Sequence, residues 1–250
     1  MSPNESTENL TGAKAAGAIP RYEGKAKVVT VLSPTEVEVY FKDDATAFNG
    51  LKKATLDGKG YFNARITARF FKYLEKNGIP THFLGDIDDR THRARLLKIV
   101  PIEVVVRNIA TGSLVKRIGM PEGKILEPAL VEYYLKDDAL GDPIIIPEHA
   151  FLLGLCDAKR LDEIRAMAVR INQLLINICT KMSLKLVDFK LEFGIADGKL
   201  YLGDEISPDT CRFWDSETNK KLDKDRFRQD LGDVMGAYRE VLTRVEGALP

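Results

Sequence analysis

Six charged residues lie within or directly beside a stretch, 186–210, that otherwise has the pattern of two strands joined by a turn. These six, which lie apart from the turn region around Asp197-Gly198, are Asp188, Lys190, Glu192, Asp204, Glu205 and Asp209. In an extended strand the first three share one face, and the other face carries Val187, Phe189, Leu191 and Phe193. The alternative interpretation is an antiparallel strand whose charged face is exposed to solvent and has no catalytic or binding role. The alternating charge signs and the Gly-Asp-Glu end of the second strand favour a functional face.

The turn at Asp197-Gly198 decides whether two of these carboxylates can meet. A two-residue loop would place Glu192 and Asp204 on opposite faces, whereas a three-residue loop with Gly198 in the left-handed region places them on one face. We therefore predict the bulged, three-residue form. A carboxylate pair suits Mg²⁺, which is held by one or two carboxylates with phosphate oxygens and water. Lys190 beside the pair could stabilise an anionic substrate or a transferring phosphoryl group.

A second candidate segment, RYEGKAKVV at 21–29, places a glycine before two lysines. Gly24 permits close approach of the backbone to a ligand, and Lys25 and Lys27 project from the same strand face. An edge strand protected by lysines is the alternative. The chain contains neither GxxxxGK[ST] nor GxGxxG. Together with the carboxylate pair, this segment favours a lid over nucleotide phosphates.

A third candidate, VVVRNIATGSLVKR at 104–117, ends an apolar run with Arg107 and continues into Thr111-Gly112-Ser113. Guanidinium groups bind phosphate oxygens bidentately, so an arginine beside this turn could clamp a phosphomonoester. A strand-ending arginine capped by a turn is the alternative. Arg212, in SPDTCRFWD at 207–215, could join the same anion site.

The apolar periodicity predicts an α+β chain with two lobes and a cleft between them. We expect a hairpin at 25–41, a loop at 41–50, a helix through 62–74, strands at 80–86 and 94–107, and helices at 157–181 and 223–246. Pro101 predicts a break or a crossing point between the lobes, and residues 111–155 should be mostly irregular. The last helix should turn inward Phe227, Leu231, Val234, Tyr238, Val241 and Val245.

Charge and composition exclude several classes of protein. With 37 basic and 37 acidic residues, the chain has no global field to attract nucleic acid or an anionic membrane. It also lacks an apolar run near the ~20 residues that a bilayer requires. Cys156, Cys179 and Cys211 are far apart, which disfavours a zinc site or a disulfide framework and favours the cytoplasm. Residues 1–20 are predicted to be a disordered extension.

Seven ordered motifs resemble those of the SAICAR synthetase (phosphoribosylaminoimidazole-succinocarboxamide synthase) family. They are YEGKAK at 22–27, FKDDATAFNG at 41–50, GIPTHF at 78–83, PIEVVVRNIATGSLVKR at 101–117, LVDFKLEFG at 186–194, LGDEISPDTCRFWD at 202–215 and DKDRFRQDLG at 223–232. The resemblance implies a ligase of purine biosynthesis that uses ATP to join carboxyaminoimidazole ribotide to L-aspartate. It also implies a two-lobed, ATP-grasp-like fold, with an N-terminal ATP-lid lobe at 21–101 and a C-terminal lobe at 102–250.

The resemblance further implies roles for individual residues. ATP would be bound by Lys25, Ala26, Lys27, Lys98, Ile99 and Glu103, and Mg²⁺ by Glu192 and Asp204. Substrate would be bound by Arg107, Ser113 and Arg212 at the ribotide phosphate, and by Asp209. Lys190 and Asp188 would lie near the imidazole carboxylate as catalytic residues, with Asp188 a candidate proton acceptor. The loops 43–50 and 207–210 are candidates for binding aspartate.

Two other functions remain open at this point. A small-molecule kinase could use the same lobes to make stable phosphate products, and a non-catalytic module could bind nucleotide without turnover. The sequence is also compatible with a homo-oligomer. The ligase hypothesis predicts phosphoryl transfer from ATP to the imidazole carboxylate, followed by attack of the aspartate amine on the acyl phosphate.

Overall fold

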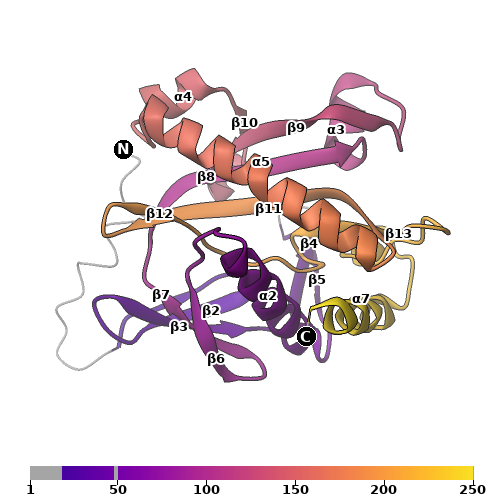
Figure 1. Cartoon of the computed structure of the whole chain (residues 1–250), viewed down its shortest axis with the longest axis horizontal. Helices are drawn as coiled ribbons and strands as arrows, with labels where there is room; N and C mark the ends of the chain where they lie inside the picture. Colours follow the sequence, from indigo (N-terminus) through magenta and orange to yellow (C-terminus); the bar gives the residue numbers. More distant parts are fainter. Residues whose placement is uncertain (1–18, 48–49, 250) are drawn as a thin grey trace.

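Three antiparallel sheets and three long helices build the part of the chain that the structure describes, residues 19–47 and 50–249 of a computed structural model (Figure 1). The long helices are α2 (Lys59–Lys76), α5 (Ala158–Lys181) and α7 (Val234–Ala248). Residues 1–18 of the predicted N-terminal extension lie outside this part. The architecture is a mixed α/β fold with several sheets. None of the described helices is long and apolar enough to cross a membrane.

The first sheet, which we call sheet A, is formed by the N-terminal strands. Its order is β1 (Arg21–Glu23), β2 (Lys27–Val31), β3 (Glu36–Phe41), β7 (Thr91–Arg95) and β6 (Phe83–Asp88). The pairing of β2 with β3 confirms the hairpin predicted at 25–41. Part of the predicted loop at 41–50 is instead a strand, because β4 (Asp44–Ala47) pairs with β5 (Lys52–Thr55).

The larger sheet, sheet C, carries most of the motifs. Its order is β10 (Ile144–Ile145), β9 (Ile125–Leu135), β8 (Lys98–Ile109), β11 (Leu184–Ala196) and β12 (Lys199–Leu202), and β13 (Cys211–Asp215) also pairs with β11. The prediction that 111–155 is mostly irregular was wrong. This region contains β9 and β10, the short helices α3 (Gly112–Ile118) and α4 (Pro147–Leu152), and a 3₁₀ turn, η1 (Asp138–Leu140).

Pro101 does not interrupt β8, so the predicted break in the strand was wrong, and the alternative of a crossing point between lobes stays a prediction. The strand continues through it, and the pairing with β11 shifts register between Glu192 and Gly194, which face Glu103 and Ile99. Pro101 therefore lies in a bulge, where the absence of a backbone donor costs little.

Helix α5 covers sheet C, packing on β8 and β11 (Figure 1). It confirms the predicted helix, and its apolar stripe of Leu161, Ile164, Ala168, Ile171, Leu175 and Ile178 is buried. The Asp157 side chain caps the helix by accepting a bond from the backbone N–H of Arg160 at 2.7 Å. The same buried cluster contains apolar side chains of α2 and α7, which joins N-terminal and C-terminal parts of the chain in one core.

The C-terminal helix is shorter than the sequence predicted. The segment 223–246 contains a short helix, α6 (Asp225–Arg228), and the long helix α7. Between them Asp230, Gly232 and Asp233 have φ values of 54°, 68° and 44°, which no right-handed helix accommodates. Leu231 is consequently 44% exposed and does not face inward. The prediction of burial holds for Phe227, Tyr238, Val241 and Val245.

Burial of His92 gives the stability of this fold a predictable pH dependence. Its ring lies 4.8 Å from that of Phe41 and 4.9 Å from that of Phe83, and burial lowers its pKa to about 4. A histidine in the unfolded chain has a pKa of about 6.5. As the pH falls the unfolded state therefore binds this proton first. The contribution is complete above about pH 6.5 and is lost toward about pH 4.

We expect His92 to contribute a slope of about 1.4 kcal/mol per pH unit to the free energy of unfolding across this window. Urea unfolding of the wild type and His92→Phe between about pH 4.5 and 7 measures the slope. The variant should show the shallower dependence; equal slopes in the two proteins would contradict the assignment.

Candidate active site

One face of sheet C gathers the charged residues of three neighbouring strands. Asp188 of β11 lies opposite Arg107 of β8 and opposite Arg212 of β13, and Glu192 lies opposite Glu103. Directly opposite residues share a face, so these side chains form rows across the sheet. On the other face Phe189, Leu191 and Phe193 belong to the buried cluster that includes α5.

The charged face is buried, which excludes the alternative of a charged face exposed to solvent. Asp188 is only 3% exposed and Glu192 only 7%. Buried carboxylates require cationic or hydrogen-bonding partners, because their desolvation is costly. Both residues have such partners from other strands, as described below.

The turn between β11 and β12 differs from the prediction. Phe193 pairs with Leu202 and Ala196 with Lys199, so the loop consists of Asp197 and Gly198 alone. Their φ values of 49° and 74° define a tight turn with two left-handed residues, which suits the twist of a hairpin and the sequence Asp-Gly. The predicted three-residue bulged loop was wrong.

Glu192 and Asp204 nevertheless converge, by a different route. The Lys190 ammonium lies 2.7 Å from Glu192 Oε1 and 3.5 Å from Asp204 Oδ2. Strand β12 ends at Leu202, and Asp204 has a left-handed φ of 57°. Because the backbone is no longer extended there, the alternation of faces that governs a strand does not apply to Asp204.

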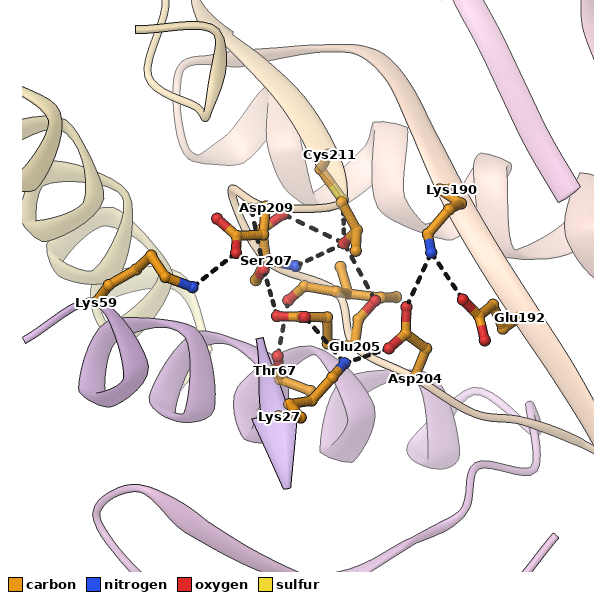
Figure 2. Close-up of polar contacts among 12 residues, drawn as sticks. Lys27, Lys59, Thr67, Lys190, Glu192, Asp204, Glu205, Ser207, Asp209 and Cys211 are labelled. Carbon is orange, nitrogen blue, oxygen red and sulfur yellow. Dashed lines mark hydrogen bonds and ion pairs between the residues drawn. The ribbon is translucent and has the colours of Figure 1, made fainter. Parts of the chain in front are cut away.

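Further lysines complete what we call the lysine–carboxylate cluster, of which Figure 2 shows Lys27, Lys190, Glu192, Asp204 and Glu205. Its other members are Lys136 and Glu103. Lys27 of β2 forms ion pairs with Asp204 and with Glu205, the latter at 2.9 Å. Lys136, just after β9, lies 2.8 Å from Glu192 Oε1, and Glu103 accepts a bond from Lys190 at 2.9 Å. Lys136 was not predicted to belong to the site, because its region was expected to be irregular. No role was predicted for Glu205 either, although the Gly-Asp-Glu strand end marked it.

Electrostatics keep Asp204 and Lys190 ionised. Burial acts to raise the pKa of Asp204, but the ammonium groups of Lys27, Lys190 and Lys136 outweigh it and hold that pKa well below its usual range. Burial likewise opposes the charged form of Lys190, yet Glu192, Asp204 and Glu103 raise its pKa well above the ordinary value. Lys190 is therefore a fixed positive charge at neutral pH and not a proton donor.

A second group of residues, the arginine row, lies along β8, β11 and β13. Arg107 Nη1 donates to Asp188 Oδ2 at 2.7 Å, Arg107 Nη2 donates to Ser113 Oγ at 3.1 Å, and Arg212 Nη1 donates to Asp188 Oδ2 at 2.8 Å. A Cβ on Gly112 would lie 2.9 Å from Arg212 Nη2, and Gly112 has a φ of 59°, so only glycine fits there. The structure thus brings together Arg107, Ser113 and Arg212, the three residues expected at one anion site.

Side chains of strand β9 also hold the arginine row, through hydrogen bonds with Arg107. Arg107 Nε donates to Glu132 Oε2 at 2.7 Å, and the Tyr134 hydroxyl accepts from Arg107 at 3.2 Å. Arg117 of α3 forms an ion pair with the other oxygen of Glu132. Glu132 and Tyr134 were not predicted either, because they lie in the same region that was expected to be irregular.

Asp209 occupies a third position, where its side chain is only 4% exposed. Lys59 of α2 lies 2.8 Å from its Oδ2, and the Tyr238 hydroxyl of α7 donates to its Oδ1 at 2.6 Å. Burial would raise the pKa of Asp209, but Lys224 and Lys59 lower it well below the usual range. The carboxylate joins α2, α7 and the loop that carries Asp204 and Glu205.

Comparisons with known proteins decide the family. The family model described as SAICAR synthetase matches residues 20–245. The chain belongs to the SAICAR synthetase family. Phosphoribosylaminoimidazole-succinocarboxamide synthase of Desulfitobacterium hafniense (strain Y51) is 55% identical over 229 residues, covering 91% of this chain and 96% of the relative. The enzyme of the same name from Persephonella marina is 50% identical and covers 90% and 95%.

Solved structures agree with this assignment. A SAICAR synthetase in complex with ADP has a TM-score of 0.90 at 46% identity, covering 92% of this chain and 99% of that chain. SAICAR synthetase from Pyrococcus horikoshii OT3 has a TM-score of 0.86, also at 46% identity, and covers 90% and 99%. The chain is therefore an ATP-dependent ligase of the family that joins carboxyaminoimidazole ribotide to aspartate in purine biosynthesis.

Other residues that the family resemblance implied lie outside the lysine–carboxylate cluster. Lys25 forms an ion pair with Asp138 of η1 at 2.7 Å, and the Ala26 carbonyl accepts from the backbone N–H of Lys42 at 2.8 Å. Lys98 is exposed and Ile99 half-buried at the start of β8. Within the described ranges, no three His, Cys, Asp or Glu side chains form a ready-made metal site, and the three cysteines are free thiols.

The Asp209 contacts lead to a stability prediction. Asp209→Ala would leave the ammonium group of Lys59, which is 1% exposed, buried without a carboxylate partner. Removing one partner of a buried ion pair costs about 3–5 kcal/mol, so we expect a loss of that size in the free energy of unfolding by urea. The double variant Asp209→Ala/Lys59→Met should recover part of it; no recovery would show that the pair does not carry the stability.

Proposed function

We propose that the charged face of sheet C, together with Lys27 of sheet A, is the active site of this ligase. The observation that carries the proposal is the convergence of Lys27, Lys136 and Lys190 on Glu192 and Asp204. This cluster adjoins the arginine row along β11, because Asp188 and Lys190 are separated by a single residue on that strand. A phosphoryl-transfer site and a site for a phosphorylated substrate are thereby adjacent.

The Glu192 and Asp204 carboxylates are the proposed ligands of Mg²⁺. Both approach one ammonium group, that of Lys190, so one cation can contact both, and carboxylate oxygens are the ligands that Mg²⁺ prefers. When bound, the ion would neutralise negative charge on the phosphates during transfer.

For ATP, we propose the segment Lys25, Ala26 and Lys27 at the phosphates, and Lys98, Ile99 and Glu103 near the base. The ADP bound in a solved relative supports a nucleotide site in this fold. The proposal includes the lobes that the sequence suggested, 21–101 and 102–250, in an ATP-grasp-like arrangement with the nucleotide between them. The cytoplasmic location and the homo-oligomer stay predictions.

For the ribotide, we propose that Arg107, Ser113 and Arg212 bind the phosphate, with the imidazole carboxylate toward Lys190. The geometry of the arginine row supports this proposal, because the guanidinium groups of Arg107 and Arg212 and the hydroxyl of Ser113 lie close together. Both oxygens of Asp188 accept bonds from these arginines. These bonds favour a role for Asp188 in orienting the guanidinium groups over the proton-accepting role that the sequence suggested.

The proposed reaction has two steps. The imidazole carboxylate attacks the γ-phosphorus of ATP, the bond to ADP breaks, and an acyl phosphate forms. The aspartate amine then attacks the acyl carbon, loses a proton, and expels phosphate as the amide forms. Lys27 and Lys190, both held ionised, stabilise the charge that develops during transfer.

ADP release measured with and without aspartate tests this function. The ligase should form ADP over repeated turnovers only when the ribotide and aspartate are both present. ADP formation with the ribotide alone, unaffected by aspartate, would indicate the kinase alternative. A module without activity would bind ATP equally well in Glu192→Ala and Asp204→Ala and show no turnover in any form.

A further inference from the structure

Two lysines of the proposed active site, Lys27 and Lys190, each form ion pairs with more than one carboxylate, and Figure 2 shows those with Asp204, Glu205 and Glu192. Lys27 pairs with Asp204, a proposed metal ligand, and with Glu205 at 2.9 Å. Lys190 pairs with Glu192 at 2.7 Å, the other proposed ligand, and with Glu103 at 2.9 Å. Glu205 and Glu103 are therefore second partners that do not belong to the proposed metal-binding pair.

A divalent cation would compete with the lysines for the same oxygens. Asp204 Oδ1 is paired with Lys27, and its Oδ2 lies 3.5 Å from Lys190. Oε1 of Glu192 accepts bonds from both Lys136 and Lys190. A cation that takes these oxygens releases ammonium groups, and a released, partly buried ammonium needs another carboxylate to keep its position.

Glu205 is built to remain with Lys27. Its Oε2 accepts a bond from the Ser207 hydroxyl at 2.7 Å, and Ser207 Oγ itself accepts from the Asp209 backbone N–H at 3.1 Å. That second bond directs the hydroxyl proton toward Glu205. Ser207 is 0% exposed and Glu205 3%, so the carboxylate is fixed and its Oε1 stays directed at Lys27.

Glu103 is the corresponding second partner of Lys190. It projects from β8 directly opposite Glu192, and two carboxylates in that position repel each other unless a cation lies between them. The Lys190 ammonium occupies that place, bonded to both. When Glu192 turns to a metal ion, Glu103 still has its bond to Lys190.

We propose that Glu205 and Glu103 are positioning residues that keep Lys27 and Lys190 directed at the substrates while Asp204 and Glu192 bind a divalent cation. The proposal rests on the metal assignment made above. The four carboxylates thus have two roles. Asp204 and Glu192 give up their ion pairs with the lysines to bind the cation, whereas Glu205 and Glu103 keep theirs.

A double-mutant cycle on nucleotide binding tests the pair Glu205–Lys27. The imido analogue of ATP is titrated calorimetrically, with Mg²⁺, into the wild type, Glu205→Gln, Lys27→Met and the double variant. We expect Glu205→Gln to weaken binding about tenfold in the wild-type background and by less than about twofold when Lys27 is already absent. Loss of a negative charge near a triphosphate would by itself tighten binding, so weakening identifies positioning.

Equal weakening in both backgrounds, no change, or tighter binding would overturn the proposal for Glu205. Ser207→Ala provides a second variant that keeps every charge; it should weaken binding about threefold in the same background-dependent way. Glu217→Gln, an exposed position, is the control for the loss of one carboxylate. No binding of the analogue to the wild type would instead count against the nucleotide site itself.

The pair Glu103–Lys190 is tested by kcat. Glu103→Gln should lower kcat about tenfold, with less than about twofold further loss when it is added to Lys190→Ala. An independent tenfold loss in the Lys190→Ala background would overturn this half of the proposal. The Kd for the ATP analogue is measured on the wild type, Glu103→Gln, Lys190→Ala and the double variant. It should change little, which distinguishes the effect of Glu103 on kcat from the effect of Glu205 on binding.

Discussion

Lys190→Ala is expected to lower kcat by about 10²–10³-fold while the Kd for ATP stays within a few fold. Lys190 is a fixed cation among Glu103, Glu192 and Asp204, with a pKa raised well above its usual value. A positive charge at this place stabilises the transferring phosphoryl group more than the bound nucleotide, so its loss falls on kcat. Steady-state kinetics and calorimetric titration of ATP measure the two quantities.

Lys185→Ala is the matched control, because Lys185 is on the same strand but bonds to Asn219 at 2.8 Å, outside the cluster. Its kcat should equal that of the wild type. Unchanged turnover in Lys190→Ala would mean that Lys190 only separates carboxylates. A large loss of ATP affinity would instead place Lys190 among the nucleotide-binding residues.

Arg107→Lys is expected to raise the KM for the ribotide about 100-fold, with the KM for aspartate nearly unchanged. Arg107 directs separate nitrogens at Asp188, Ser113 and Glu132. A lysine ammonium cannot reproduce this planar fork, and each hydrogen bond to a charged group is worth about 1.5–3 kcal/mol. Initial rates with each substrate varied in turn measure the two KM values.

Thermal unfolding of Arg107→Lys separates binding from folding. The variant should also lose stability, because Asp188 and Glu132 are both buried. Arg165→Lys, at an exposed position of α5, serves as the control and should change neither quantity. Lower stability with an unchanged KM for the ribotide would assign Arg107 a purely structural role.

Local patterns in the sequence predicted the elements whose signals are short-range. The stripe of α5 and the alternation of β11 appear as expected, since each depends on the periodicity of one segment. The prediction failed for β9, whose residues are mostly half-buried or exposed and include a proline at position 128. That strand is held in place by its pairing with β8, and such long-range pairing leaves no periodic signal.

The α7 boundary shows a second limit of local signals. The apolar spacing of Phe227, Leu231 and Val234 is helical, but the chain between them adopts left-handed conformations at Asp230 and Asp233. Aspartate tolerates that region better than most residues, and Gly232 lies between the two. Apolar spacing alone therefore overestimated the length of the helix.

The ordered motifs along the chain indicated the family, and period-two alternation predicted the charged face of β11. Only the tertiary structure determined how the pieces meet. Glu192 and Asp204 converge through the left-handed backbone of Asp204 after a two-residue turn, and not through the predicted register. Lys27, Lys136 and Glu205 join them from other strands and loops, since ion pairs between distant segments depend on packing that no local pattern encodes.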